Sequence, residues 1–418
     1  MTDPAPDRLA DAVVADFVHG RFAAIEARFS PAMREAFPLD GLKSIWRALT
    51  TDFGAFASRG ESQSSYRDGA VLVVIPIAFE RRTIDLKLVF DGEALVGLFH
   101  APHSVAVSDW QAPSYAAAES MSELAVAIGP ADKPLPGVLT LPVGVAKPPV
   151  VILIHGSGPQ DRDQSQGPNR PFRDIAVGLA AQGVAALRFD KRTKVYPADM
   201  AALVAPTVKE EALDDAAAAV ALVAARPEID ARRIVIAGHS LGATMAPRIA
   251  AANPAVAGVV MLAAATRPLA SSAVAQIEFQ MWLSAGPDER QSAALDALSA
   301  DAARVDAARP GDAGAPFMGV AISYWADLNA HDPAAEAAAL EIPVLAMRGG
   351  RDYQVGSTDF DRLAASLAGR PSARLTSFPA LNHLFMAGAG LAGAQDYETA
   401  DHVSGEVIDA IARFAASL

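Results

Sequence analysis

The sequence predicts an α/β protein with a mostly parallel sheet and a helical cap insertion, preceded by a small α+β domain. From residue 149 onward, continuously apolar runs alternate with alanine-rich helical segments. A long helical segment interrupts this alternation before the last two apolar runs, and the first 110 residues follow a different pattern. Because 418 residues exceed one ordinary core, we expect two domains, covering residues 1–110 and 111–418.

The N-terminal domain is expected to place helices before an antiparallel sheet. Apolar residues recur at three- and four-residue steps through residues 9–60, as at Val13, Val14 and Phe17, which predicts helices. Three β-rich runs follow, "AVLVVIPIAFE", "TIDLKLVF" and "EALVGLFH". The next stretch is rich in Pro, Ser and Ala without a helical period, so we place the domain boundary near Trp110.

The second domain begins with an expected antiparallel hairpin, "SELAVAIG" and "LPGVLTLP". The later strands are apolar at almost every position, which indicates burial on both faces and hence a parallel sheet with right-handed crossovers. These runs are "VVILIHG", "VAALRFD", "RIVIAGH", "VAGVVMLA", "IPVLAMRGG" and "ARLTSFP".

The helical segment at about 266–340 is expected to form a cap over the carboxyl edge of the strands. Its aromatic residues have helical spacing, which is typical of the core of the cap itself. Ligand pockets are mostly apolar, however, so some of these side chains should line a substrate pocket. Tyr324 and Trp325 are the first candidates for substrate binding.

The strongest local motif is "GHSLG" at 238–242, which lies between an apolar run and a helical one. A Gly-x-Ser-x-Gly pentapeptide in this context predicts a nucleophile elbow, a strained strand-to-helix turn that exposes the serine hydroxyl. Ser240 is therefore the expected catalytic nucleophile. The alternative is a chance match, since the chain contains 30 glycines.

A serine nucleophile needs a base to take its proton and an acid to orient that base. Asp352 follows the run "IPVLAMRGG", and His383 follows "ARLTSFP", so both are expected at the carboxyl ends of strands. We predict that they complete a catalytic triad. Less favoured acids and bases are Asp327, Asp332, Asp359, His19, His100, His103, His331 and His402.

The tetrahedral intermediate also needs hydrogen-bond donors for its oxyanion. We expect the backbone N–H of Leu241 to supply one donor, because it follows the nucleophile. The glycine-rich "HGSG" turn at 155–158 should supply another, from Ser157 or alternatively Gly158. His155 in this turn is expected to brace it.

The oxyanion turn continues into a charged stretch that contains Arg162. A second charged stretch, "RFDKRT", ends a strand at the same sheet edge and contains Arg192. The favoured interpretation is a network of opposite charges that holds the turn in shape. The alternative is that Arg162 or Arg192 binds a carboxylate of the substrate, although ion pairs are often structural.

Composition excludes several functions. There are no cysteines, which removes disulfides, thiolate nucleophiles and cysteine-held metals. A net charge of −13 opposes binding to nucleic acid, and no apolar run is long enough for membrane insertion. No phosphate-binding or dinucleotide motif occurs, so we expect no cofactor and no metal.

The N-terminus lacks the basic start and apolar core of a signal peptide. We therefore expect a cytoplasmic protein, or a periplasmic or secreted one if a signal peptide has been removed. The sequence does not choose an oligomeric state, and a homodimer remains open.

The second domain resembles bacterial α/β-hydrolase esterases related to the serine aminopeptidase S33 group. In these proteins a small domain of unknown function, cystatin-like or similar to nuclear transport factor 2, precedes the hydrolase, and the N-terminal "FVHGRFAAIEARFSPAMREAFPLDGLKSIWRAL" is similar to it. One departure is Ala243, where these proteins commonly have a further glycine. The resembling segments are "VVILIHGSGPQDRDQ", "GPNRPFRDIAVGLAAQGVAALRFDKRT", "RPEIDARRIVIAGHSLGATMAPRIAA" and "YWADLNAHDP".

The resemblance implies a serine carboxylesterase for short-chain acyl esters, with Ser240, Asp352 and His383 as the triad. A related alternative is an aminopeptidase or amidase-like serine hydrolase, which relative rates on esters and amides would separate. An alternative of a different class is a non-catalytic binding or sensory protein on a hydrolase fold. Labelling of Ser240 by a fluorophosphonate would distinguish that class from an enzyme.

Overall fold

The structure is a computed structural model that describes residues 6–37, 39–67, 70–103, 110–284 and 286–418. The chain divides into two compact units, Met1–Ala106 and Val107–Leu418. Among the helices in the described ranges, none has the length and apolar character needed to cross a membrane.

The N-terminal unit combines short helices with an antiparallel sheet. Its strands pair in the order β1-β3-β4-β5, and β2 also pairs with β3. Alternate residues of β3 are buried, so one face of the sheet forms the core with the helices. The elements are α1 (Pro6–Val18), α2 (Phe22–Glu26), α3 (Pro31–Ala36), α4 (Leu39–Phe53), β1 (Phe56–Arg59), β2 (Gln63–Arg67), β3 (Ala70–Phe79), β4 (Thr83–Asp91) and β5 (Ala94–Pro102).

Two of these strands differ from the sequence analysis. β1 falls within residues 9–60, for which the apolar spacing predicted helices, and β2 was not predicted at all. The helical pattern ends at Gly54, whose φ of +88° interrupts a helix. After that glycine, Phe56 pairs antiparallel with Phe79 of β3, so pairing with a neighbouring strand overrides the local pattern.

The C-terminal unit is built on an eight-stranded sheet in the order β13-β12-β11-β10-β8-β9-β7-β6. β6 and β7 form the predicted antiparallel hairpin, and β7 joins β9 antiparallel. All other neighbours pair in parallel, as the sequence predicted. The strands are β6 (Met121–Ile128), β7 (Leu135–Pro142), β8 (Val150–Ile154), β9 (Ala185–Phe189), β10 (Ile234–His239), β11 (Val256–Leu262), β12 (Val344–Gly349) and β13 (Ala373–Phe378).

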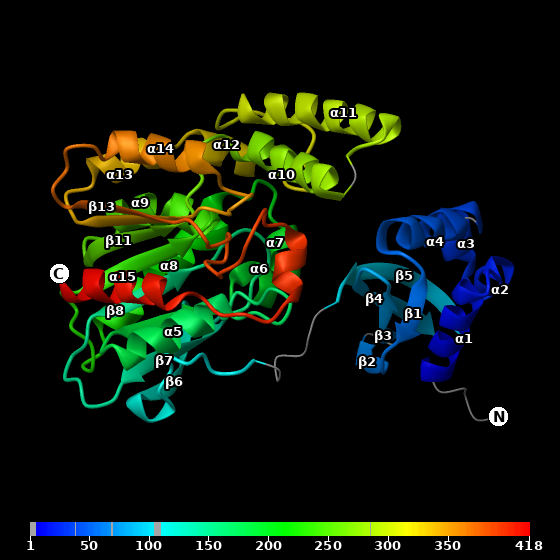
Figure 1. Ribbon diagram of the computed structural model, residues 1–418, viewed down its shortest axis with the longest axis horizontal. Coiled ribbons are helices and arrows are strands. Elements are labelled where there is room, and N and C mark those ends of the chain that lie inside the picture. Colours follow the sequence, from blue (N-terminus) through cyan, green and yellow to red (C-terminus); the bar gives the residue numbers. More distant parts are fainter. Residues whose placement is uncertain (1–5, 38, 68–69, 104–109, 285) are drawn as a thin grey trace. The chain divides into compact units, whose positions relative to one another are not determined.

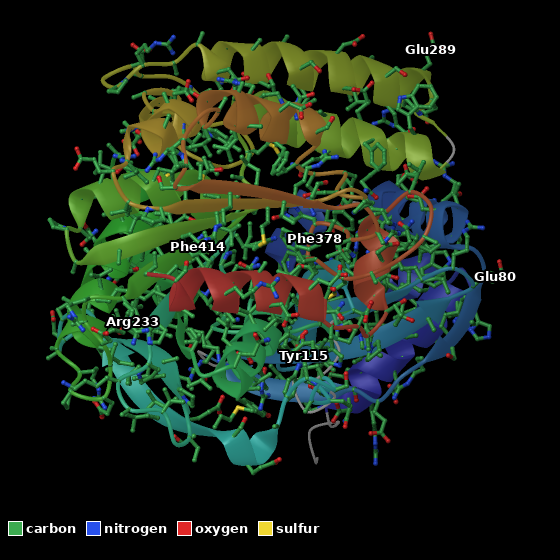
Figure 2. The ribbon with its side chains drawn as sticks, turned by 60° about the vertical axis from the view of Figure 1, so that its left-hand side comes forward. Glu80, Tyr115, Arg233, Glu289, Phe378 and Phe414 are labelled. Atoms are coloured by element: carbon green, nitrogen blue, oxygen red, sulfur yellow. The ribbon has the colours of Figure 1, made fainter. Side chains whose placement is uncertain are left out.

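Successive residues of the central strands enter two different cores. Ile236 of β10 packs in the cluster with α8 and α9, whereas Ala237 packs in the cluster with α5 and α15. Figure 1 shows these helix pairs on opposite faces of the sheet, and Phe378 and Phe414, labelled in Figure 2, belong to the α15 side. Both faces are thus covered. The helices are α5 (Pro171–Ala181), α8 (Asp214–Ala224), α9 (Leu241–Ala252), α14 (Ser357–Ser366) and α15 (Gly405–Ala416).

The segment between β11 and β12 forms the helices expected of a cap. α10 and α11 pack against each other, and both contact α12 (Figure 1). The short α13 then leads back to the sheet. Their bounds are α10 (Leu269–Ser284), α11 (Glu289–Asp306), α12 (Ile322–Asn329) and α13 (Pro333–Ala339).

Candidate active site

Ser240 occupies the turn between β10 and α9 in a backbone conformation that non-glycine residues rarely adopt, with φ +54° and ψ −119°. The flanking glycines make the turn sterically feasible. A Cβ at Gly238 would collide with the carbonyl oxygen of Gly242, and one at Gly242 with the carbonyl oxygen of Ile154. The Ser240 N–H donates to the Leu262 carbonyl at 2.9 Å, which ties the turn to β11.

Asp352 and His383 lie together after β12 and β13. The His383 ring places Nδ1 2.7 Å from Asp352 Oδ2, and both side chains are almost fully buried. The other carboxylate oxygen, Oδ1, accepts from the backbone N–H groups of Gln354 and Val355 at 2.8 and 2.9 Å. With its remaining acceptor sites occupied in this way, the carboxylate is oriented to hold the imidazole in one position.

The rival acids and bases have other hydrogen-bonding roles. Asp327 pairs with Arg248, Asp332 caps α13, and Asp359 binds Arg267 and the Thr266 N–H. The remaining histidines with polar contacts are equally committed: His19 contacts the Ala15 carbonyl, His103 contacts Asp85, His331 contacts Glu336 and His402 contacts Asp174.

The predicted oxyanion turn after β8 closely approaches Ser240, the predicted nucleophile. A Cβ added to Gly156 would lie only 3.3 Å from the Ser240 Cβ. The Gly156 N–H is already used, because it donates to Gln164 Oε1 at 2.8 Å. Within the described ranges, by contrast, the N–H groups of Ser157 and Leu241 have no hydrogen-bond acceptor.

Gln164 and His239 connect this turn to the catalytic histidine candidate. Gln164 Nε2 lies 2.7 Å from His239 Nδ1, and His239 Nε2 lies 2.8 Å from the His383 carbonyl oxygen. Since a carbonyl only accepts, Nε2 carries the proton and Nδ1 accepts from Gln164. Burial, with a smaller contribution from the neighbouring His383, lowers the pKa of His239 to about 3. His239 is therefore neutral, and its two ring nitrogens connect Gln164 on one loop with His383 on another.

Sequence reasoning missed the role of Gln164 and His239. His239 was visible as the variable position of the pentapeptide, yet nothing local indicates its partners. Gln164 adopts φ +50° and is almost fully buried, and neither property can be read from its neighbours.

The charged stretch after the oxyanion turn forms ion pairs within the protein. Arg162 donates through Nε and Nη2 to the two carboxylate oxygens of Asp190, at 3.0 and 2.7 Å. Asp163 pairs with the buried Arg188, and Arg192 pairs with Asp215. These are the contacts that a loop-bracing network requires, whereas a substrate contact of Arg162 stays a prediction.

The remaining predicted residues are buried or turned toward protein groups. His155 is buried between the rings of Phe172 and Phe189, and burial lowers its pKa to about 3. Trp325 packs edge-on against Phe317 in the cap core, and it is 8% exposed. Tyr324 is partly buried, and burial, with the nearby Glu211 charge, raises its pKa. A direct substrate contact by either cap residue stays a prediction.

The cap reaches the loop that carries Asp352. Phe279 of α10 stacks on Tyr353 with ring centroids 5.3 Å apart, and Gln276 donates to the Gln354 carbonyl at 3.2 Å. The first cap helix thus lies beside the candidate acid. Across the described ranges, no group of three His, Asp or Glu side chains is arranged to hold a metal ion.

Comparison with known proteins identifies both parts of the chain. Residues 10–98 match a family of unknown function (DUF3887), and residues 166–387 match the serine aminopeptidase S33 family. Esterase EstD of Thermotoga maritima is 32% identical over 387 residues, covering 92% of this chain and 89% of that protein.

Solved structures with a similar fold include proteins named as esterases and proteins named as peptidases. The esterase domain of a Rhodothermus marinus protein is 20% identical, with a TM-score of 0.42, over 70% of this chain and 98% of that one. Est1E of Butyrivibrio proteoclasticus is 16% identical, with a TM-score of 0.45, over 70% of this chain and 99% of that one. The family matches and the order of the sheet confirm the predicted α/β-hydrolase fold with a small preceding domain. The chain belongs to the α/β-hydrolase esterases of the serine aminopeptidase S33 family, and it is a serine hydrolase of carboxylic esters.

Proposed function

We propose that this protein hydrolyses short-chain acyl esters of small molecules through an acyl-enzyme on Ser240. His383 takes the proton of the Ser240 hydroxyl as its oxygen attacks the ester carbonyl, and Asp352 orients and stabilises the resulting imidazolium. The Leu241 and Ser157 N–H groups bind the oxyanion. His383 returns the proton to the leaving alcohol, and water then repeats the cycle on the acyl-enzyme.

The observation that carries this proposal is the Asp352–His383 pair, whose histidine ring lies 4.6 Å from the ring of His239, the residue before the strained Ser240. The Nδ1–Oδ2 distance of 2.7 Å leaves Nε2 as the nitrogen available for a serine proton. The φ of +54° at Ser240 is a conformation that persists only where the surroundings enforce it. The relative EstD is named an esterase, which supports ester rather than amide bonds.

The test is covalent labelling combined with kinetics. A fluorophosphonate should label the parent and Ser377→Ala but not Ser240→Ala. Ser377 is a matched control because it is exposed on β13 and its hydroxyl only accepts from Arg348. Ser240→Ala should lower kcat by about 10⁴-fold or more, since removal of a triad nucleophile leaves only binding and oxyanion effects.

Substrate class is tested with p-nitrophenyl esters of two to sixteen acyl carbons beside aminoacyl p-nitroanilides. We expect kcat/KM to be greatest for the short esters and far lower for every anilide. Equal rates on anilides and short esters would assign an aminopeptidase or amidase instead. Labelling that persists in Ser240→Ala would contradict the assignment of the nucleophile.

A further inference from the structure

One peptide group of the oxyanion turn, which joins Gly156 to Ser157, is held at its carbonyl end. The carbonyl oxygen of Gly156 and the N–H of Ser157 belong to the same planar group and point in opposite directions in a trans peptide. Whatever fixes the oxygen therefore also fixes the direction of the Ser157 N–H. This N–H is the second proposed oxyanion donor.

The group that holds this oxygen is the ammonium of Lys191. Lys191 Nζ donates to the Gly156 carbonyl oxygen at 2.8 Å, and the residue is only 3% exposed. Lys191 follows the end of β9, and its own N–H donates to the Gln160 carbonyl at 3.1 Å. The lysine is thus attached to the oxyanion turn by both its backbone and its side chain.

Lys191 is in turn paired with a buried carboxylate. Its Nζ forms an ion pair with Glu211, which is 8% exposed. Burial lowers the pKa of Lys191, whereas the Glu211 charge opposes that shift. Glu211 lies in η3 (Lys209–Leu213), a π-helical turn before α8, and such turns often occur at functional sites.

The cap completes the set of contacts. Tyr324 of α12 lies near Glu211. Burial raises the pKa of the tyrosine, and the Glu211 charge adds to the rise. A continuous polar chain therefore runs from Tyr324 through Glu211 and Lys191 to the Gly156 carbonyl. A lysine with its donors used in this way has no acceptor and cannot serve as the base of the reaction.

We infer that Lys191, held by Glu211, is a positioning residue that aligns and polarises the Gly156–Ser157 peptide as an oxyanion donor. The inference rests on the proposed function, because it assumes attack by Ser240 on a carbonyl. A cation at the carbonyl oxygen draws electron density from the peptide and makes its N–H a stronger donor. This effect grows as negative charge develops on the substrate oxygen, so it favours the transition state over the bound ester.

A purely structural role is the competing explanation. Buried ion pairs are often no more stabilising than apolar residues of similar size, so stability alone gives no reason for a lysine and a glutamate here. Breaking such a pair by removing one partner, however, leaves a buried charge and destabilises the protein. The experiment must therefore separate catalysis from stability.

Three variants make that separation. Lys191→Met removes the ammonium and keeps an apolar side chain of similar length. Lys191→Met/Glu211→Gln also removes the partner charge and keeps a polar side chain of the same shape at position 211. The control, Arg267→Met, breaks the ion pair with the buried Asp359 in the same unit. Asp359 and Arg267 bond to each other and Asp359 also to the Thr266 N–H, which is not part of the oxyanion turn.

The readouts are kcat and KM for a short ester and the inhibition constant of a trifluoromethyl ketone. In the inhibited enzyme, Ser240 Oγ bonds to the ketone carbon, the C=O π bond breaks, its oxygen becomes an oxyanion and the serine proton moves to His383. Loss of an oxyanion donor costs about 10²–10³ in kcat. Weakening one should cost about 10- to 100-fold.

We expect both Lys191 variants to have a kcat about 10- to 100-fold lower than the parent, with KM nearly unchanged. Affinity for the ketone should fall by the same factor as kcat/KM. Arg267→Met should keep its kcat and its ketone affinity, even where its melting temperature falls as far as that of Lys191→Met.

The inference is overturned if the double variant keeps the parental kcat, or if ketone affinity and kcat/KM fall by unrelated factors. It is also overturned if Arg267→Met loses as much kcat as Lys191→Met. Failure of the proposed function has a different signature, because Ser240→Ala would then retain activity and the parent would not bind the ketone.

Discussion

Two turns at the carboxyl edge of the sheet supply the proposed oxyanion donors, and they are held in different ways. The turn at Ser240 is shaped by its own backbone, since Gly238 and Gly242 have no room for a Cβ. The turn at Gly156 is held by distant side chains, Gln164 at its N–H and Lys191 at its carbonyl. One turn is a local steric solution, and the other depends on partners elsewhere in the chain.

This contrast explains why the two turns differ in how they should respond to mutation. A sterically determined turn has few tolerated sequences, and a single added methyl group disrupts it. A turn held by side chains loses one restraint at a time. Substitutions in the first turn should therefore act nearly all-or-none, whereas those in the second should act in graded steps.

The largest expected effect is that of Gly238→Ala. The added Cβ would collide with the Gly242 carbonyl and the Ala243 N–H, so the turn cannot keep Ser240 in place. We expect a loss of about 100-fold or more in kcat/KM, since a displacement of about 1 Å has that cost, together with a lower melting temperature. Gly356→Ala is the control, because a Cβ there meets no atom. Near-parental activity of Gly238→Ala would show that the turn is not sterically determined.

Gln164→Leu should have the next largest effect. It leaves the buried Gly156 N–H and His239 Nδ1 without partners, which should cost about 3 kcal/mol of unfolding free energy. We expect about tenfold lower kcat as the turn loses one restraint. Denaturant unfolding measures the loss of unfolding free energy, and ester kinetics measure the loss of kcat. Gln166→Leu, at an exposed position, is the control. A loss as complete as that of Gly238→Ala would remove the contrast between the turns.

Each turn also buries one neutral histidine, which predicts acid sensitivity. The folded pKa values of His155 and His239 are lowered to about 3, below the ordinary 6.5. The unfolded chain thus binds more protons between these values, so stability is fully present above pH 6.5 and falls as the pH drops toward 3. Each histidine contributes a slope of about 1.4 kcal/mol per pH unit.

His155→Phe should reduce the slope of unfolding free energy against pH by the contribution of one titrating group. Unfolding of the full chain by urea at several pH values between 7 and 5 measures the slope, and the exposed His100→Gln should leave it unchanged. The groups facing His155 are Lys191, Asp161 and Asp190, and His383 faces His239. An unchanged slope in His155→Phe would show that this histidine is not buried in the neutral form.

The smallest expected effect is that of Arg162→Ala. Its side chain is partly exposed and its pair with Asp190 is bidentate, so about 1 kcal/mol of unfolding free energy should be lost. If Arg162 only braces the turn, kcat/KM should fall equally for neutral esters and for esters that carry a carboxylate. A loss confined to the carboxylate-bearing esters would instead assign Arg162 to substrate binding.

The sequence predicted what local rules determine. The central strands follow from their apolar runs. The elbow follows from its pentapeptide, because the two glycines are required there by the lack of space for a side chain. Asp352 and His383 could be singled out because each follows a predicted strand at the sheet edge where Ser240, the predicted nucleophile, also lies. The structure brings these two residues together at 2.7 Å, and their catalytic roles remain proposals.

The parts that escaped sequence reasoning depend on tertiary contacts. Gln164 reaches His239 across 75 residues, and the Lys191 side chain reaches Gly156 across 35. β1 forms because β3 offers an edge, although the preceding sequence favours a helix. No local pattern encodes such partners, and only the folded arrangement reveals them.

The position of Tyr324 near Glu211 has a practical consequence for engineering. A library meant to widen the range of accepted acyl groups would naturally randomise the cap. Variation at Tyr324 would then change turnover as well as selectivity, because its hydroxyl is part of the polar chain that ends at the oxyanion turn. Keeping Tyr324 fixed, together with Gln276 and Phe279 of α10 beside the Asp352 loop, and varying the rest of the cap should let selectivity evolve with less loss of rate.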